Sequence, residues 1–363
     1  MDLRLKKLDI YIIKKFIVSF FISLLLIIGV VIIWDISEKI DDFVANQAPL
    51  KDIILYYYMN YIPYFINMFS PMFVFLTVIF FTSRMAANSE IIAILSGGVS
   101  YHRMMVPYLI SAMFIALLSL GLNLYVVPKA NATRQGFEAT YIKHHNNYKH
   151  TNIHYQIAPG QFVYVKSFSD YSKTAYQMTV ESVENGKLVS KLTAESAVWD
   201  TTTNGWHMRN YTLREYSKGM GDRITMGPVL DTVIALDVND FYRNEKTVET
   251  LTIDGLNQLI ETQNMRGDAG VIYAKIEKNT RMALPFCSFV LTIIGVSLSS
   301  RKKRGGIGWN IGLGIALSFS YILFLRFSQM FVFTGTLPPG IALWIPNIMY
   351  TIIAAVLYRL APK

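Results

Sequence analysis

Long apolar runs occupy both ends of the chain, and a long polar stretch lies between them. A transmembrane helix requires about 20 mostly apolar residues. Segments of this kind lie at residues 10–34, 53–82, 104–127, 283–299, 307–333 and 341–360. The pattern therefore predicts an α-helical membrane protein with six transmembrane helices, three on each side of an inserted domain.

The polar stretch shows the alternation that is typical of β-strands. Polar and apolar residues alternate in YQMTVESV and in KLVSKLTAESAVW, so each strand is expected to turn one face toward a core or groove. Asn185-Gly186 and Asn204-Gly205 separate such runs, and Asn-Gly is a strong hairpin signal. Short strands at this spacing predict a sandwich, a jellyroll or a barrel. We therefore expect an inserted all-β, jellyroll-like domain.

These patterns divide the chain into four parts. Residues 1–134 hold the first three transmembrane helices, and residues 283–363 hold the last three. Residues 135–245 form the β domain, and residues 246–282 form a polar connector. Within the connector, DGLNQLIETQNMRG has the composition of a short helix that ends at Gly267.

Composition agrees with the membrane assignment. Hydrophobic residues make up 52% of the 363-residue chain and charged residues 16%, and the mean hydropathy is +0.33. Trp34, Trp309 and Trp344 lie at predicted helix ends, as expected of interfacial anchors. The single cysteine, Cys287, lies inside the fourth span, so the β domain is expected to fold without a disulfide.

Charge predicts the orientation, because Lys and Arg accumulate in cytoplasmic segments of membrane proteins. With the N-terminus in the cytoplasm, the inner segments hold Arg4, Lys6, Lys7, Lys14, Lys15, Arg84, Arg103, Arg301, Lys302, Lys303, Arg304, Arg359 and Lys363. The expected outer loop at 35–52 has two lysines against five acidic residues. We therefore expect both termini in the cytoplasm and the β domain on the other side of the membrane. The net charge of +9 is then a topology signal, and no nucleic-acid partner is expected.

Sequence motifs for common chemistry are missing. The chain has no G-x-x-x-x-G-K-[ST], H-E-x-x-H or G-x-S-x-G motif and no paired cysteines. We therefore expect no ATP binding through a P-loop, no enzyme activity and no cofactor. Four histidines in KHHNNYKHTNIH, at positions 144, 145, 150 and 154, suggest a metal site. No cysteine or acid accompanies them, and a solvated loop explains the run equally well.

The segment RMAANSEIIAILSGGVSYHRM, residues 84–104, predicts a short helix between the second and third spans. Asn88 or Ser89 can cap it, and Glu90 in its first turn is favoured by the helix dipole. Gly97-Gly98 can end it. Two interpretations follow from the residues alone. The helix docks into a groove on a soluble partner, or it is an interfacial turn whose apolar side rests on lipid.

Nearly the whole sequence resembles the LptF/LptG permease family, the membrane subunits of the lipopolysaccharide-export ABC transporter. The resemblance rests on LDIYIIKKF, IDDF, NSEIIAILSGGVSYHRMMVP, AESAVWDTTTNGWHMRNYTLREY, TRMALPF, GVSLSSRKKRGG and LPPGIALWIPN. It implies an inner-membrane protein with a periplasmic β-jellyroll that transports lipopolysaccharide. It also implies three kinds of partner: an LptB-like ATPase dimer, a second LptF/LptG-like permease, and LptC/LptA-like periplasmic bridge proteins. ATP is then hydrolysed by a separate polypeptide.

By this resemblance, residues 88–98 are the coupling helix and Glu90 is its acidic coupling residue. The positions that the resemblance assigns to ATPase coupling are Arg84, Glu90, Ile94, Gly97, Gly98 and Ser100. The family also places the first and fifth spans at lateral gates. Gly308-x-x-x-Gly312 is typical of close helix–helix packing, and with Gly314 it would let the fifth span pack closely and shift.

A lipid with several acyl chains and a phosphorylated head needs an apolar cavity and cations near its phosphates. The candidate head-group residues are Lys39, Lys275, Lys278, Arg281 and Arg326. Arg326 lies within an apolar span, where an ionisable residue is a functional candidate. Snorkelling toward the interface is the alternative for these cations.

Two other functions stay open at this stage. One is a membrane scaffold whose β domain recruits envelope partners, and the other is a permease for lipoproteins or another lipid. The residues leave open whether the chain is the LptF-like or the LptG-like subunit, with a slight preference for LptG.

Overall fold

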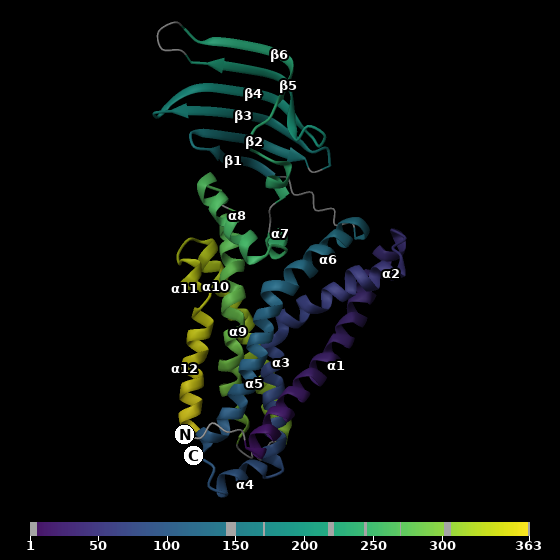
Figure 1. Cartoon of the computed structure of the whole chain (residues 1–363), viewed down its shortest axis with the longest axis vertical. Coiled ribbons are helices and arrows are strands. Elements are labelled where there is room, and N and C mark those ends of the chain that lie inside the picture. The colour runs from purple at the N-terminus through teal and green to yellow at the C-terminus, as the bar shows by residue number, and fades with distance from the viewer. Residues whose placement is uncertain are drawn as a thin grey trace. The chain divides into compact units, whose positions relative to one another are not determined.

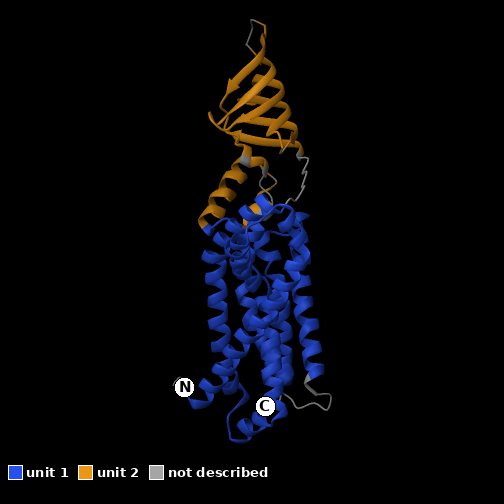
Figure 2. Cartoon of the chain, turned by 90° about the vertical axis from the view of Figure 1, so that its right-hand side faces the viewer, with its two compact units in different colours: residues 1–143, 250–253, 275–363 blue, residues 144–249, 254–274 orange. Residues whose placement is uncertain are grey.

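A computed structural model describes most of the chain. The described residues are 6–142, 150–169, 171–216, 221–242, 245–268, 270–300 and 306–361. They fall into two compact units, shown in blue and orange in Figure 2. The first unit comprises residues 1–143, 250–253 and 275–363, and the second comprises residues 144–249 and 254–274.

The first unit is helical, as predicted. Its elements before the β domain are α1 (Lys7–Ala45), α2 (Leu50–Asp52), the π-helix η1 (Ile53–Tyr58), α3 (Met59–Ala87), α4 (Glu90–Ser96), α5 (Tyr101–Gly121), the π-helix η2 (Leu122–Val126) and α6 (Val127–Tyr141). After it come α9 (Val271–Ser299), α10 (Gly306–Phe333), α11 (Pro339–Ala342) and α12 (Ile345–Leu360). Within the described residues, six helical stretches are long and apolar enough to cross a membrane. Three precede the β domain and three follow it (Figure 1).

A stripe with helical spacing packs α1 onto its neighbours. Ile12, Phe16, Phe20 and Leu24 recur at every fourth residue of α1 and are buried against side chains of α3 and α5. A second core joins α3 to α9, α10 and α12. Burial shows which helices are central, since 67% of the apolar window of α3 and 72% of that of α9 are buried, against 17% for α1. Most of α1 therefore presents an apolar surface to lipid or to a partner.

The prediction of an outer loop at residues 35–52 is wrong for its first part, because α1 continues to Ala45. The third span is likewise extended by α6 to Tyr141. Both extensions have a physical reason. Phe43 and Phe137 are buried together with Tyr57, and their ring centroids lie 6.1 Å apart. Apolar packing beyond the hydropathy limits thus keeps these polar segments helical.

The second unit contains the β domain. Its strands are β1 (His150–Ala158), β2 (Gln161–Ser169), β3 (Thr174–Glu184), β4 (Lys187–Asp200), β5 (Gly205–Glu215) and β6 (Arg223–Thr232). Within the described residues they form one antiparallel sheet in the order β1-β2-β3-β4-β5-β6. The expected jellyroll-like domain is therefore a simple meander. Both predicted hairpins are present, and Asn185 and Gly186 adopt φ of 49° and 72°, as a tight turn requires.

The side-chain pattern changes phase along one line across the sheet. Buried residues stand three apart in successive strands, as in Ala175 and Met178 of β3 and Ala194 and Ala197 of β4. Strand pairing on both sides of this line nevertheless keeps a single register. The residues on the line, which we call the crossing row, are Asn152, Lys166, Gln177, Glu195, Asn210 and Pro228.

Left-handed backbone occurs on alternate strands of the crossing row. Asn152, Gln177 and Asn210 have φ of 56°, 49° and 49°, which is uncommon for residues other than glycine. Asn210 also donates a hydrogen bond to Glu195, 2.6 Å away. Each strand therefore bends at the same level, and the apolar side chains stay on one face, which we call the inner face.

The chain after β6 covers part of the inner face. Trp206 donates its indole N–H to the carbonyl of Leu236 at 2.8 Å, and the rings of Phe168 and Phe241 stack with centroids 4.3 Å apart. The 3-10 helix η3 (Val238–Tyr242), α7 (Glu245–Glu249) and α8 (Ile253–Arg266) follow. The predicted connector helix is confirmed as α8, with Gly267 at φ 65° just after it.

Candidate functional site

The predicted short helix between the second and third spans is present as α4, Glu90–Ser96. Ser89 is its N-cap residue, but its side chain makes no capping hydrogen bond and its φ is 60°. Ile91 is buried, while Ile92 is 51% exposed. The helix thus anchors one apolar side chain in the bundle and presents another outward.

Glu90 is tied to the first residues of α1. Its carboxylate accepts hydrogen bonds from the Tyr11 hydroxyl at 2.8 Å and from Lys15 Nζ at 3.4 Å. Lys15 Nζ also donates to the Tyr11 hydroxyl at 2.6 Å. Partial burial raises the pKa of Glu90, but the hydrogen bonds from Tyr11 and Asn88 and the charge of Lys15 outweigh it, so the pKa lies below its ordinary value. Glu90 is therefore ionised at neutral pH and links α4 to α1.

A second link joins α1 to the start of α5. Arg103 donates two hydrogen bonds to the buried carboxylate of Asp9, at 2.7 and 2.5 Å. Such a bidentate pair fixes both position and orientation. At the same level, His102 of α5 hydrogen-bonds Tyr358 of α12. The segment that follows α4 is thus connected to the first and last spans.

The other predicted coupling residues have different surroundings. Ser100 caps α5, because its hydroxyl accepts a hydrogen bond from the Arg103 backbone N–H at 3.3 Å. Gly98 has φ of 82°, a backbone conformation that favours glycine, whereas Gly97 has an ordinary φ as the C-cap residue of α4. Ile94 packs partly buried against the core of α1, α3 and α5. Arg84 is exposed near the end of α3.

Lys39 is held by its own chain. Its ammonium lies 2.8 Å from Asp35, whose side chain is only 4% exposed, and it also hydrogen-bonds Tyr57. Tyr57 and Tyr58 donate hydrogen bonds to the same carboxylate at 3.3 and 3.1 Å. The positive charge of Lys39 is therefore matched within the chain.

Arg281 is buried, with 2% exposure. It donates to Glu277 and to the carbonyl of Leu251, each at 2.7 Å. Arg281 thus holds the chain segment that precedes α8. Arg326, in contrast, is exposed on α10 and donates to Gln329 at 3.2 Å. The remaining head-group candidates, Lys275 and Lys278, are half-buried on α9.

Sequence reasoning missed Arg134 of α6. Its guanidinium lies over the rings of Tyr64 and Tyr61, 4.6 and 5.6 Å from their centroids. The ammonium of Lys39 lies 5.8 Å from the same Tyr61 ring, so the two cations share one aromatic neighbour. Arg134 was overlooked because it lies beyond the apolar limit of the third span.

The three glycines of the fifth span differ in their contacts. A Cβ built on Gly314 would lie 2.6 Å from Cδ1 of Ile79, so Gly314 permits close packing of α10 on α3. A Cβ on Gly308 or Gly312 would meet no atom within 4 Å among the described parts of the chain. Gly308 and Gly312 are exposed within the described part of the chain, so their predicted close packing is not seen there.

A small polar cluster inside the helical unit was also missed. Asn67 and Asn123 exchange hydrogen bonds of 2.5 and 2.8 Å, and Ser119 donates to Asn67 at 3.0 Å. Beside the cluster lies a cavity of about 210 Å³, lined mainly by apolar side chains of α1, α3 and α5. Such a cavity suits a hydrocarbon chain.

The histidine run of the sequence is only partly described. His144 and His145 lie outside the described residues, and His154 stands on β1 with its ring 4.7 Å from that of Tyr164. The basic run 301–304 also lies outside the described residues.

Comparison with known proteins identifies the family. Residues 10–360 match the family model of the lipopolysaccharide export system permease LptF/LptG. No curated protein sequence matches the chain. Because the match covers nearly the whole chain, the chain belongs to the LptF/LptG family. It is therefore a multi-pass permease of a lipopolysaccharide-export ABC transporter, and such permeases are non-catalytic transmembrane subunits.

Proposed function

We propose that this LptF/LptG permease receives the motion of a separate, LptB-like ATPase dimer through α4 and passes it to α1. The observation that carries the proposal is the contact of Glu90 with Tyr11 and Lys15. Through it, a displacement of α4 acts directly on the first turns of α1. The Asp9–Arg103 pair adds a second connection at the same level. Coupling thus needs no long chain of intermediate residues.

A second LptF/LptG-like permease completes the transporter in this proposal. The apolar window of α1 is only 17% buried and that of α10 only 28%, and Gly308 and Gly312 leave room on α10. These surfaces suit the two gates at which a partner permease would meet the first and fifth spans. Gly314 keeps α10 close to α3 while the gate moves.

The head group of the lipid is proposed to meet cations near the ends of α1, α3 and α6. Lys39 and Arg134 are the best supported pair, because both lie near Tyr61. Both cations have a carboxylate partner within the chain, Asp35 at 2.8 Å from Lys39 and Glu138 at 3.7 Å from Arg134, so a lipid phosphate would have to compete with these carboxylates. Arg281 contributes mainly by fixing the segment before α8, while the half-buried Lys275 and Lys278 and the exposed Arg326 are additional contacts.

The inner face of the β-sheet is proposed to accept the acyl chains and to pass them to LptC/LptA-like bridge proteins. Beyond its covered part, this face continues through half-buried apolar side chains, among them Val180, Leu192 and Tyr211. We also place both termini in the cytoplasm and the β domain in the periplasm. In support, the start of α1 and the end of α12 lie at the α4 end of the helical unit (Figure 1).

The test is Glu90→Ala in the assembled transporter, reconstituted in lipid vesicles with its ATPase. Loss of the carboxylate should reduce lipid release per ATP hydrolysed at least ten-fold, while the complex still assembles. Exposed Glu38 of α1 supplies the control substitution, Glu38→Ala. Unchanged lipid release by the Glu90→Ala transporter would refute the coupling role.

A further inference from the structure

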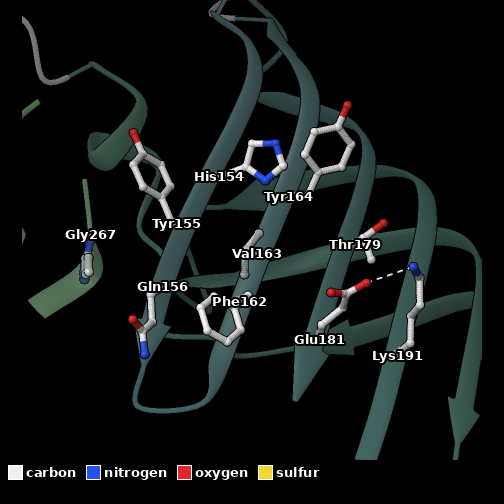
Figure 3. Close-up of a pocket in the computed structure, with 11 residues that line it drawn as sticks. His154, Tyr155, Gln156, Phe162, Val163, Tyr164, Thr179, Glu181, Lys191 and Gly267 are labelled. Carbon is white, nitrogen blue, oxygen red and sulfur yellow. Dashed lines mark ion pairs between the residues drawn. The ribbon is translucent and has the colours of Figure 1, made fainter. Parts of the chain in front are cut away.

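A pocket of about 450 Å³ lies on the β domain, lined by residues of β1 to β4 and by Arg266 and Gly267 at the end of α8 (Figure 3). Most of the strand residues that line it point to the face opposite the inner face. This volume falls within the roughly 300–1,000 Å³ that is usual for ligand sites. Strand register explains how it is built. His154, Tyr164 and Thr179 form one row across β1, β2 and β3. Gln156, Phe162, Glu181 and Lys191 form the adjacent row.

Two aromatic rings form the floor of the pocket. Phe162 and Tyr164 are two residues apart on β2, so they point to the same face about 7 Å from each other. Phe162 is 41% exposed, whereas Val163 between them is 2% exposed and belongs to the inner core. The hydroxyl of Tyr164 donates to Asn152 at 3.0 Å, and its ring contacts His154. At least one of the two rings is therefore held in place before any ligand binds.

The acidic and basic side chains that line the described pocket are matched with partners. Glu181 and Lys191 form an ion pair at 2.8 Å. Arg266, at the pocket edge, pairs with the buried Asp240 at 2.8 Å and donates to the carbonyl of Ala235. A phosphate would have to displace one of these partners before it could pair with a cation, whereas an uncharged ligand would not. The charge balance thus favours an uncharged ligand.

The polar groups of the pocket also argue against an acyl chain as the ligand. An acyl chain would remove water from Gln156, Thr179 and the Glu181–Lys191 pair and would offer them no hydrogen bonds in return. A sugar ring satisfies both kinds of surface, since its C–H face packs on an aromatic face and its hydroxyls pair with amide, carboxylate and hydroxyl groups. We propose that this pocket binds an uncharged sugar segment. Given the proposed function, on which this identification rests, the segment belongs to the oligosaccharide of the transported lipid.

Binding to the full-length chain in lipid nanodiscs tests the proposal. The probe is a lipopolysaccharide core oligosaccharide from which lipid and phosphates have been removed. Saturation-transfer NMR should show contact between its ring protons and the protein, and calorimetry should give a saturable isotherm. Phe162→Ala should weaken binding at least five-fold, because one of the two stacking faces is lost. Thr179→Val should weaken it about three-fold while changing only one lining hydroxyl.

The matched control is Tyr176→Ala. Tyr176 lies on the same face of β3, is 44% exposed and does not line the pocket, so its removal should leave binding unchanged. Absence of saturable binding to the wild-type chain would overturn the proposal. Equal losses for Tyr176→Ala and Phe162→Ala would also overturn it, as would much tighter binding of the phosphorylated oligosaccharide.

The two proposals can fail separately. If Glu90→Ala exports lipid normally but Phe162→Ala loses sugar binding, the coupling role fails and the sugar pocket stands. If Glu90→Ala stops export and no variant alters oligosaccharide binding, the pocket proposal fails alone.

Discussion

Removing the Tyr11 hydroxyl should weaken the link between α4 and α1 without disturbing either helix. The hydroxyl donates to Glu90 at 2.8 Å, and a hydrogen bond to a charged group is worth about 1.5–3 kcal/mol when it is shielded from water. Tyr11 is 44% exposed and the Glu90 side chain 28%, so water replaces part of this interaction. The expected cost is about 1 kcal/mol, or about five-fold in a rate.

The assay is ATP-driven lipid release from vesicles that contain the assembled transporter. Tyr11→Phe should slow release about five-fold and leave the rate of ATP hydrolysis unchanged. In a Glu90→Gln background the same substitution should have little further effect, because the charged acceptor is already gone. Tyr125→Phe provides the control, since Tyr125 is 71% exposed. Equal slowing by Tyr11→Phe in both backgrounds would refute a link through Glu90.

Three further predictions follow from local geometry. Between spin labels at the exposed Ile10 and Ile92, the distance should stay constant from pH 7 down to about 4.5 and broaden below it. The reason is that the pKa of Glu90 is lower in the folded protein than its ordinary value. The link between Glu90 and α1 is therefore fully present above the ordinary pKa and is lost as the pH falls through the pKa of the folded protein. Glu90→Gln should give the broad distribution at every pH. Lys39→Met should lower the melting temperature in detergent, with a loss of about 2–3 kcal/mol in the free energy of unfolding, because it leaves the buried Asp35 without its positive partner. Adding Asp35→Asn should restore part of this loss. No recovery in the double variant would contradict the explanation. Gly160→Ala should lower the free energy of unfolding of the β domain by about 2–4 kcal/mol, because it combines a left-handed φ with a Cβ 2.4 Å from the Val183 carbonyl oxygen. Gly186→Ala is the control, since Gly186 has a similar φ but open space around it, and it should cost only about 1 kcal/mol. Equal melting temperatures of the two variants would contradict the steric argument.

Much of the fold could be predicted from local signals in the sequence. Hydropathy located the six spans because a bilayer core demands uninterrupted apolar length. The Asn185-Gly186 turn located a hairpin because few other dipeptides accept its backbone angles. Where helices continued past the apolar limit, the prediction failed. Phe43 and Phe137 stabilise those extensions through a contact between residues far apart in the chain, and no local window contains that information.

The short helix between the second and third spans could be predicted from the sequence, but its contacts could not. The composition of residues 84–104 indicates a helix with Glu90 in its first turn, as found in α4, while the coupling role of Glu90 comes from the family resemblance. Its partners Tyr11 and Lys15 lie 79 and 75 positions away, so only the packing of α1 beside α4 brings them together. Lys39 and Arg281 were chosen for charge and location, yet their neighbours Asp35 and Glu277 decide how much of that charge is free.

The crossing row gives the β domain a bend that its strand order alone does not. Pairing continues in one register on both sides of the row, and the left-handed residues Asn152, Gln177 and Asn210 lie on alternate strands. These residues bend the strands at one level, so their backbone torsions set the angle between the two halves of the sheet. In the proposed function, in which acyl chains travel along the inner face, that angle would set the space open to them.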